Sequence, residues 1–247
     1  MSYNIGLVSI SFRGCTPEEI IKSVKDAGLS CIEWGSDVHA PKDDENRLEE
    51  ICKLQEEYGV SCSSYGTYFF IGAMPTDELE KYAKAAKKLK TNILRVWCGN
   101  KNSQDYTAKE KEALFYECKK AAEIAEKANV ILCMECHNFT YTNTKESALE
   151  LMQEINSPNF RMYWQPNQYN EVEENEKYAE IISSYTEHLH VFNWKGDQRF
   201  PLKDSIDTWK KYLNKFEGDR TLLLEFVPDD KIETLKIEAQ ALKEIIK

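Results

Sequence analysis

Four polar residues in the second half of the chain are of types that bind divalent metal ions. Glu135, Gln165, His190 and Glu225 follow one another at intervals of 30, 25 and 35 residues. Two carboxylates, one imidazole and one amide oxygen suit Mn²⁺, Mg²⁺, Co²⁺ or Zn²⁺, and the two negative charges neutralise a divalent cation. Each residue alone also fits a structural role, as a salt-bridged glutamate or a hydrogen-bonded histidine. Because the four recur together, we predict a site for one divalent metal ion.

The residues around these four predict strands that turn them toward one interior. In VILCMECH every second residue is apolar and suits contact with helices, so Glu135 and His137 face the other way. The same alternation places Glu225 of TLLLEFV, His190 of HLHVFNW and Gln165 of FRMYWQP on the inward side. Polar side chains at corresponding ends of successive strands therefore predict a common centre.

The strands that carry these residues belong to a longer series. Eight short apolar stretches rich in Val, Ile, Cys and aromatic residues alternate with segments of helical period, a rhythm typical of a parallel sheet. We predict a single α/β domain over 1–247, a (β/α)8 TIM barrel, because eight such units close a barrel and no phosphate-binding G-x-G-x-x-G follows the first stretch. The predicted strands are 5–12, 30–34, 60–66, 92–99, 130–137, 160–166, 189–194 and 221–227.

Helix boundaries are also marked. Thr16, followed by Pro17 and Glu19, has the pattern of an N-cap with a capping box, while Gly28 and Gly59 are expected to end helices. The other predicted helices are 43–58, 76–90, 107–128, 144–155, 174–187 and 231–246, with a short one within 201–217.

Several residues at strand ends are candidates for substrate binding. Trp34 and Trp194 close two predicted strands, and aromatic faces near a polar pocket suit stacking against sugar rings, although tryptophans there also pack against helices. Asp37 and His39 follow Trp34 in the WGSDVHAP segment, where such residues also serve as turn and cap residues. We expect these four to contact a small carbohydrate.

The overall composition excludes several classes of protein. The chain has 42 acidic and 32 basic residues, a net charge of −10 that disfavours nucleic acid as a partner. It has no segment apolar enough for a membrane span and no pattern of a secretory signal, so we expect a cytoplasmic protein with no membrane partner. The eight scattered cysteines are expected to be reduced. A homo-oligomer is an alternative to a monomer.

Several of these motifs resemble the xylose isomerase-like barrel superfamily, which includes sugar phosphate isomerases, ketose 3-epimerases and the family-2 abasic-site endonucleases. The resemblance rests on IEW, LRVWCG, MECHN, LHVFNW (where relatives have H-V-K-D) and LLLEFV. It implies that Glu135, Gln165, His190 and Glu225 hold one Mn²⁺-like ion and that the two glutamates exchange protons with substrate. Gln165 stands where relatives usually have Asp.

The resemblance also points to residues around the substrate. Gln168 stands where the epimerases place a histidine, and the region after the seventh strand carries Trp194, Lys195 and Arg199, which we assign to substrate binding. The endonuclease branch is disfavoured, because it requires more histidine ligands and a basic groove for DNA.

The expected reaction is proton transfer beside a carbonyl group. We predict a divalent-metal-dependent sugar isomerase or epimerase that acts through an enediolate, with Glu135 and Glu225 as proton carriers. One alternative is a metal-dependent lyase or dehydratase acting on a keto-sugar or cyclic hydroxy-ketone, for which His137 and Lys195 are spare acid or base groups. A second alternative is a non-catalytic sugar-binding barrel.

Overall fold

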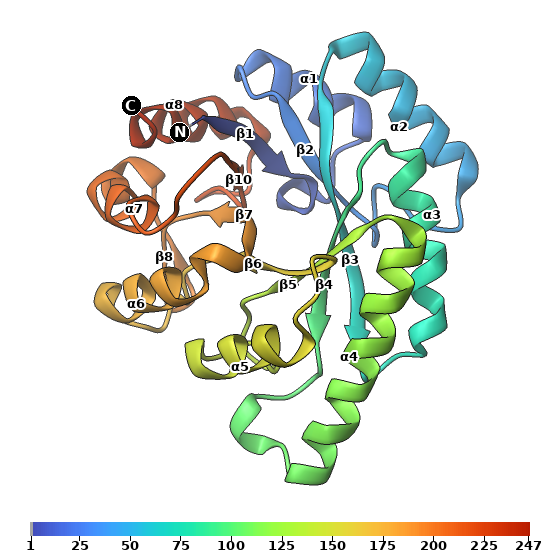
Figure 1. Cartoon of the computed structure of the whole chain (residues 1–247). Helices are drawn as coiled ribbons and strands as arrows, with labels where there is room; N and C mark the ends of the chain where they lie inside the picture. The colour runs from blue at the N-terminus through green and yellow to red at the C-terminus, as the bar shows by residue number, and fades with distance from the viewer. Residues whose placement is uncertain (1) are drawn as a thin grey trace.

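The chain folds into a closed parallel barrel surrounded by helices, as the alternation of apolar segments predicted (Figure 1). The computed structural model describes residues 2–247. Around the barrel the strands run β1, β10, β7, β6, β5, β4, β3, β2, and β1 pairs with both β10 and β2 to close the circle. The barrel strands are β1 (Tyr3–Val8), β2 (Cys31–Gly35), β3 (Ser61–Ile71), β4 (Ile93–Cys98), β5 (Ile131–Glu135), β6 (Phe160–Trp164), β7 (Thr186–Val191) and β10 (Arg220–Leu224).

Eight α-helices cover the outside of the barrel, one after each barrel strand. They are α1 (Pro17–Asp26), α2 (Glu45–Tyr58), α3 (Leu79–Lys88), α4 (Ala108–Ala128), α5 (Lys145–Ile155), α6 (Val172–Ile182), α7 (Ile206–Leu213) and α8 (Leu235–Ile245). Six 3₁₀ turns add to them: η1 (Ser9–Phe12), η2 (Thr76–Glu78), η3 (Ser103–Asp105), η4 (Ser183–Tyr185), η5 (Leu202–Ser205) and η6 (Ile232–Thr234).

Local sequence signals set the helix ends as expected. Thr16 caps α1 through a complete capping box, in which its hydroxyl accepts from the Glu19 backbone N–H and the Glu19 carboxylate accepts from the Thr16 N–H. Gly59 ends α2 in the left-handed conformation, at a φ of 64°. The helix predicted over 174–187 is shorter than expected, because the chain leaves α6 at Ile182 and begins β7 at Thr186.

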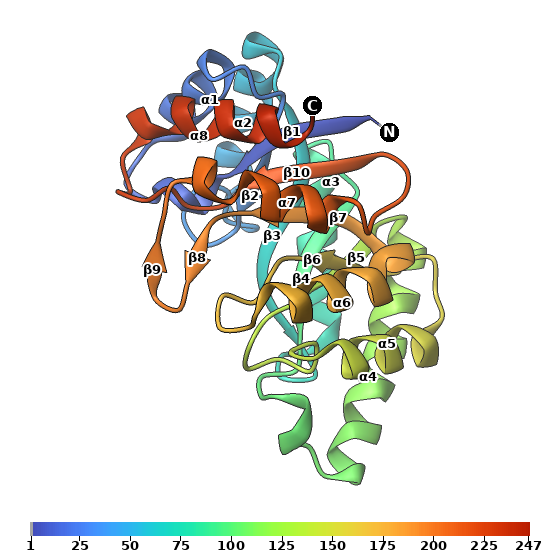
Figure 2. The same ribbon diagram turned by 90° about the vertical axis from the view of Figure 1, so that its left-hand side faces the viewer.

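A small antiparallel hairpin of β8 (Trp194–Lys195) and β9 (Gln198–Arg199) was not predicted. The hairpin follows β7 and stands out from the end of the barrel opposite the two chain termini, which lie close together (Figure 2). It therefore belongs to the face where the barrel strands end, the face that carries active sites in this architecture.

The barrel interior holds an apolar cluster of its own. Val8, Cys31, Cys133 and Leu223 form part of a small apolar cluster inside the barrel, separate from the larger core between strands and helices.

All eight cysteines are free thiols, as expected. Within residues 2–247, no helix is long and apolar enough to cross a membrane.

Candidate metal centre and pocket

The four residues predicted to bind metal meet at the carboxyl end of the barrel. Glu135 ends β5, His190 lies in β7, and Gln165 and Glu225 directly follow β6 and β10. The Nδ1 atom of His190 lies 2.9 Å from Gln165 Oε1, 3.4 Å from Glu135 Oε1 and 3.5 Å from Glu225 Oε2. One ligand atom from each of Glu135, His190 and Glu225 falls within 4.8 Å of the others, and all three residues are buried.

The second nitrogen of His190 indicates how the ring is oriented. Its Nε2 atom is buried without a hydrogen-bond partner among residues 2–247, and Glu33 Oε1 lies 3.5 Å from it. A metal-binding histidine commonly directs its other ring N–H at a carboxylate, which fixes the tautomer. Glu33 is placed to do this for His190, so Nδ1 is the nitrogen available to an ion.

A buried arginine organises the glutamates. Arg95 in β4 donates from Nε to Glu33 Oε1 (2.9 Å) and from Nη1 to Glu135 Oε2 (2.7 Å). Trp97 Nε1 donates to the same Glu135 oxygen at 2.6 Å. Glu135 is therefore held through Oε2, while Oε1 faces His190.

The charges of this centre match a divalent cation. The buried carboxylates are Glu33, Glu135 and Glu225, and Arg95 supplies one positive charge against them. When His190 is neutral, two negative charges remain, and buried charges of this kind are expected to be paired or to bind metal. The donor set and its charge thus fit Mn²⁺ or a similar ion.

Burial and neighbouring charges shift the pKa values of Glu135 and Glu225 in opposite directions. Burial disfavours ionisation of both, but at Glu135 the Arg95 guanidinium and His190 outweigh it and lower the pKa to about 2. At Glu225 burial prevails over the attraction of His190, the charge of Glu135 adds to it, and the pKa is raised. Burial alone would lower the pKa of His190, but Glu225 and Glu33 raise it to about 10. A metal ion and a proton therefore compete for His190 Nδ1.

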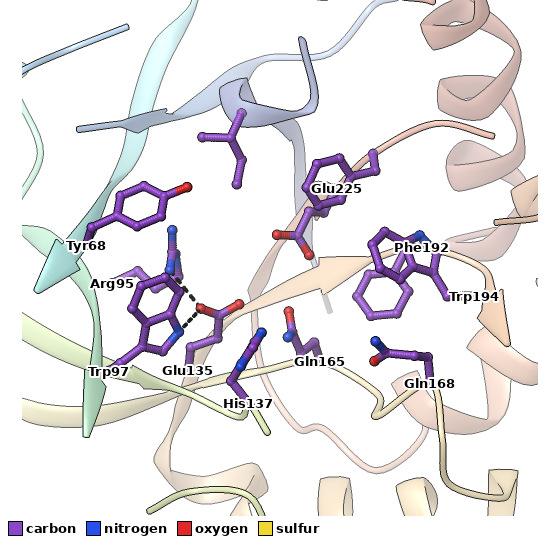
Figure 3. Close-up of a pocket in the computed structure, with 12 residues that line it drawn as sticks. Tyr68, Arg95, Trp97, Glu135, His137, Gln165, Gln168, Phe192, Trp194 and Glu225 are labelled. Atoms are coloured by element: carbon purple, nitrogen blue, oxygen red, sulfur yellow. Dashed lines mark hydrogen bonds and ion pairs between the residues drawn. The ribbon is translucent and has the colours of Figure 1, made fainter. Parts of the chain in front are cut away.

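A pocket of about 150 Å³ opens above this centre. Figure 3 shows Glu135, Gln165 and Glu225 at its middle, with aromatic side chains on two opposite sides. One aromatic side holds Tyr68 and Trp97, and the other holds Phe192 and Trp194. Phe226 also lines the pocket, with its ring centroid 5.4 Å from that of Trp194. Aromatic walls around convergent polar groups suit a small ring-shaped ligand. We call this space the metal pocket.

Comparison with known proteins places this architecture in a family. The family model for xylose isomerase-like TIM barrels matches residues 21–245. The chain belongs to this family. A 3-dehydroshikimate dehydratase of Bacillus anthracis is 30% identical over 169 residues, which are 66% of this chain and 60% of that protein.

Solved structures of other proteins have the same fold. The probable 3-DHS dehydratase AsbF of Bacillus anthracis, involved in petrobactin synthesis, has a TM-score of 0.83 at 19% identity, covering 98% of this chain and 99% of that one. D-psicose 3-epimerase of Clostridium cellulolyticum H10, solved with D-tagatose, has a TM-score of 0.69 at 16% identity, covering 98% and 97%. At these identities the likeness concerns the fold.

His137 lies at the mouth of the metal pocket of this xylose isomerase-like barrel. Its ring is exposed to solvent and contacts Trp97, with ring centroids 5.8 Å apart. Its Nδ1 atom lies 2.6 Å from the carbonyl oxygen of Asn138. That contact requires Nδ1 to carry the proton in the neutral ring, which leaves Nε2 free to accept one.

Trp34 and His39 differ from the expectation that they contact substrate. Trp34 is fully buried and donates from Nε1 to Gln55 Oε1 of α2 at 2.8 Å, so it packs into the helix layer. His39 is also buried, with Nδ1 3.1 Å from Ser9 Oγ and Nε2 3.2 Å from the Cys15 carbonyl. Neither side chain lines the metal pocket, because the strand alternation and local hydrogen bonds turn both away from it.

Asp37 reaches the pocket only through other residues. Its carboxylate pairs with Arg13 at 3.0 Å, and Arg13 in turn donates to the Tyr68 hydroxyl. Of these three residues, Tyr68 is the one that lines the metal pocket. Asp37 therefore lies outside the lining of the metal pocket and does not contact the space for substrate.

The residues after β6 and β7 that the sequence assigned to substrate binding do not all line the metal pocket. Gln168 and Trp194 line the metal pocket. Lys195 points into a neighbouring cavity. Arg199 lies behind the wall, with its guanidinium carbon 4.8 Å from the Trp194 ring centroid and 4.4 Å from that of Phe226, and it pairs with Asp230.

Sequence reasoning missed some residues of this site. Arg95 was not singled out and Trp97 was not assigned to the site, although both lie within LRVWCG and share one phase of the strand alternation. That shared phase was the signal, because it turns both side chains inward. For Phe226 the prediction was wrong: within the predicted strand 221–227 the alternation turns it away from Glu225, toward the helices. The strand β10 ends at Leu224, Phe226 has a φ of 60°, and its side chain lines the pocket.

Proposed function

We propose that this protein is a divalent-metal-dependent dehydratase that removes water from a hydroxylated cyclic ketone. The observation that carries the proposal is the unbonded Nε2 atom of His137 beside a metal-type triad in which Glu135 is already held by Arg95 and Trp97. The 30% identity to a 3-dehydroshikimate dehydratase supports the same reaction class.

The metal-binding residues would be Glu135, His190 and Glu225, with Gln165 as the fourth. Mn²⁺ is the first candidate, with Mg²⁺, Co²⁺ and Zn²⁺ as alternatives. A bound cation there stabilises the negative charge that develops on a carbonyl oxygen when an adjacent C–H bond is broken.

His137 is the proposed acid and base. Its Nε2 atom accepts the proton from the carbon next to the carbonyl, and the electron pair of that C–H bond forms the new C=C bond as the C–O bond of the β-hydroxyl breaks. The same nitrogen returns the proton to the departing oxygen, so one water molecule leaves. Because Nδ1 is directed at the Asn138 carbonyl, the imidazole keeps one orientation through both steps.

Sugar epimerisation, our first expectation from the sequence, requires two bases that face the substrate from opposite sides. Oε2 of Glu135 accepts hydrogen bonds from Arg95 and Trp97, and Oε1 faces His190. That leaves Glu135 suited to hold an ion and poorly suited to receive a proton, especially with its lowered pKa. These contacts favour elimination over two-base epimerisation.

The test is turnover of two cyclic hydroxy-ketones by the Mn²⁺-loaded protein, 3-dehydroshikimate and the neutral keto-sugar 1,5-anhydro-D-fructose. We expect ultraviolet absorbance from a conjugated product with at least one of them, loss of activity with EDTA, and recovery on adding Mn²⁺. His137→Ala is expected to lower kcat by about 10²- to 10⁴-fold and to keep Mn²⁺ affinity.

Glu135→Gln is the matched variant for this experiment, because it is expected to lose both Mn²⁺ binding and activity. Exchange of substrate protons in D₂O without loss of water would instead identify an epimerase or isomerase. Failure to bind Mn²⁺ would favour a sugar-binding barrel without catalysis.

A further inference from the structure

A second and larger cavity adjoins the metal pocket. It has a volume of about 420 Å³ and lies between the segment linking β6 to α6, the segment that follows β7 and includes β8, and helix α7. Gln168, Phe192 and Trp194 line both spaces. Figure 3 shows Gln168 and Trp194 on the side of the metal pocket away from Tyr68 and Trp97. We call this cavity the outer pocket.

Hydrogen bonds connect the segments that line the outer pocket. The backbone N–H of Gly196 donates to the carbonyl of Gln168 at 3.0 Å, and the Tyr169 hydroxyl donates to Asp197 Oδ1 at 2.5 Å. These two bonds attach the β8–β9 hairpin, which Figure 2 shows projecting from the barrel, to the loop after β6. Trp209 fixes the floor by donating from Nε1 to the Phe192 carbonyl at 2.8 Å.

The polar groups of the outer pocket are mostly neutral and have spare hydrogen-bonding capacity. Among residues 2–247, the side chains of Gln168, Asn170 and Thr208 have no hydrogen-bond partner. Asn193 donates to the Pro201 carbonyl and keeps its amide oxygen free. Amides and hydroxyls beside aromatic rings match a hydroxylated ring, whose C–H faces stack on the aromatic groups.

The charges of the outer pocket disfavour an anionic ligand there. The charged residues that line the outer pocket are Glu171, Lys195 and Asp204, two acids against one base. In the metal pocket the one arginine, Arg95, is committed to Glu33 and Glu135. A carboxylate or phosphate in the outer pocket would therefore meet the Lys195 ammonium together with two carboxylates, those of Glu171 and Asp204.

We propose that the outer pocket is a second subsite that binds an uncharged sugar ring joined to the group that reacts in the metal pocket. The substrate class is then a conjugate of two rings, of which the one in the outer pocket is an uncharged sugar. The assignment of the reacting ring rests on the proposed dehydratase function, whereas the assignment of the outer pocket rests on its own lining and volume.

Binding of neutral saccharides tests the subsite directly. In saturation-transfer NMR titrations with the Mg²⁺-loaded protein, we expect saturable binding of cellobiose, weaker binding of D-glucose, and still weaker binding of D-glucuronate. Thr208→Trp, which places an indole in the outer pocket, is expected to raise the Kd for cellobiose at least tenfold. Lys210→Trp on the exposed side of the same helix is the control and is expected to leave that Kd unchanged within twofold.

Thr208→Val serves as a milder second variant, since it keeps the shape of the side chain and removes the hydroxyl; we expect a Kd about two- to tenfold higher. The proposal is overturned if cellobiose and glucose show no saturable binding, if neither Thr208 variant weakens it, or if glucuronate binds more tightly than glucose. Failure of the wild-type protein to turn over either ketone, with saccharide binding intact, would count against the dehydratase function and leave the subsite standing.

Discussion

At the scale of single residues, the centre of the barrel brings like charges together, and Arg95 partly neutralises them. Three glutamates and a histidine approach one another in a buried space, which is costly unless the charges are paired. Arg95 bridges Glu33 and Glu135 and thereby divides their roles. Glu135 presents its remaining oxygen toward His190 Nδ1, whereas Glu33 lies next to His190 Nε2 and fits the role of a positioning residue.

Glu33→Gln tests this positioning role. Gln keeps the size of the side chain but presents no full negative charge to the Nε2–H of His190, so we expect Mn²⁺ affinity to fall about 10- to 100-fold, as for other residues that support a metal ligand. Isothermal titration calorimetry with Mn²⁺ provides the measurement. Glu238→Gln, at a buried glutamate of α8 that accepts from the Leu202 N–H, removes the same charge far from the site and is expected to bind Mn²⁺ normally. Equal affinities in the two variants would contradict the role given to Glu33.

The residue scale also shows where the sequence was informative and where its evidence was misapplied. Alternation along a strand correctly turned Glu135 and His190 toward one interior. The same alternation places Trp34, next to Glu33, on the opposite face, and the structure has it there. The expectation that Trp34 binds substrate failed because residue type was given more weight than strand phase.

At the scale of elements, all eight barrel strands were predictable because each is an apolar run bounded by loops. The β8–β9 hairpin was not, since two-residue strands have no measurable periodicity. Its attachment depends on contacts distant in sequence, such as that of Tyr169 with Asp197. The outer pocket, which needs this hairpin, therefore lay beyond prediction from the sequence.

Strand β3 approaches the Glu33–Arg95 pair so closely that it has room only for glycine. A Cβ atom on Gly66 would lie 2.6 Å from Glu33 Oε1 and 3.0 Å from Arg95 Nη2. We expect Gly66→Ala to lower the free energy of unfolding by about 1–3 kcal/mol, because the buried ion pair must shift to accommodate the methyl group. Urea unfolding measures this change. Gly14→Ala is the matched control, with no atom within 4 Å of the new Cβ, and an effect above about 0.5 kcal/mol there, or none at Gly66, would refute the argument.

At the scale of the whole molecule, the ligands of the proposed ion come from β5, β7 and the chain just after β6 and β10, so only the closed barrel brings them together. An ion that binds the folded chain alone stabilises it by mass action, by about 2.7 kcal/mol when the free ion is at 100 times its Kd. For a chain of 247 residues, this corresponds to a rise in Tm of about 5–11 °C. We expect the rise to increase with Mn²⁺ concentration in thermal unfolding followed by circular dichroism. Glu238→Gln should show the full shift and Glu135→Gln almost none; a shift of equal size in both would mean that Mn²⁺ stabilises the protein from somewhere other than the centre of the barrel.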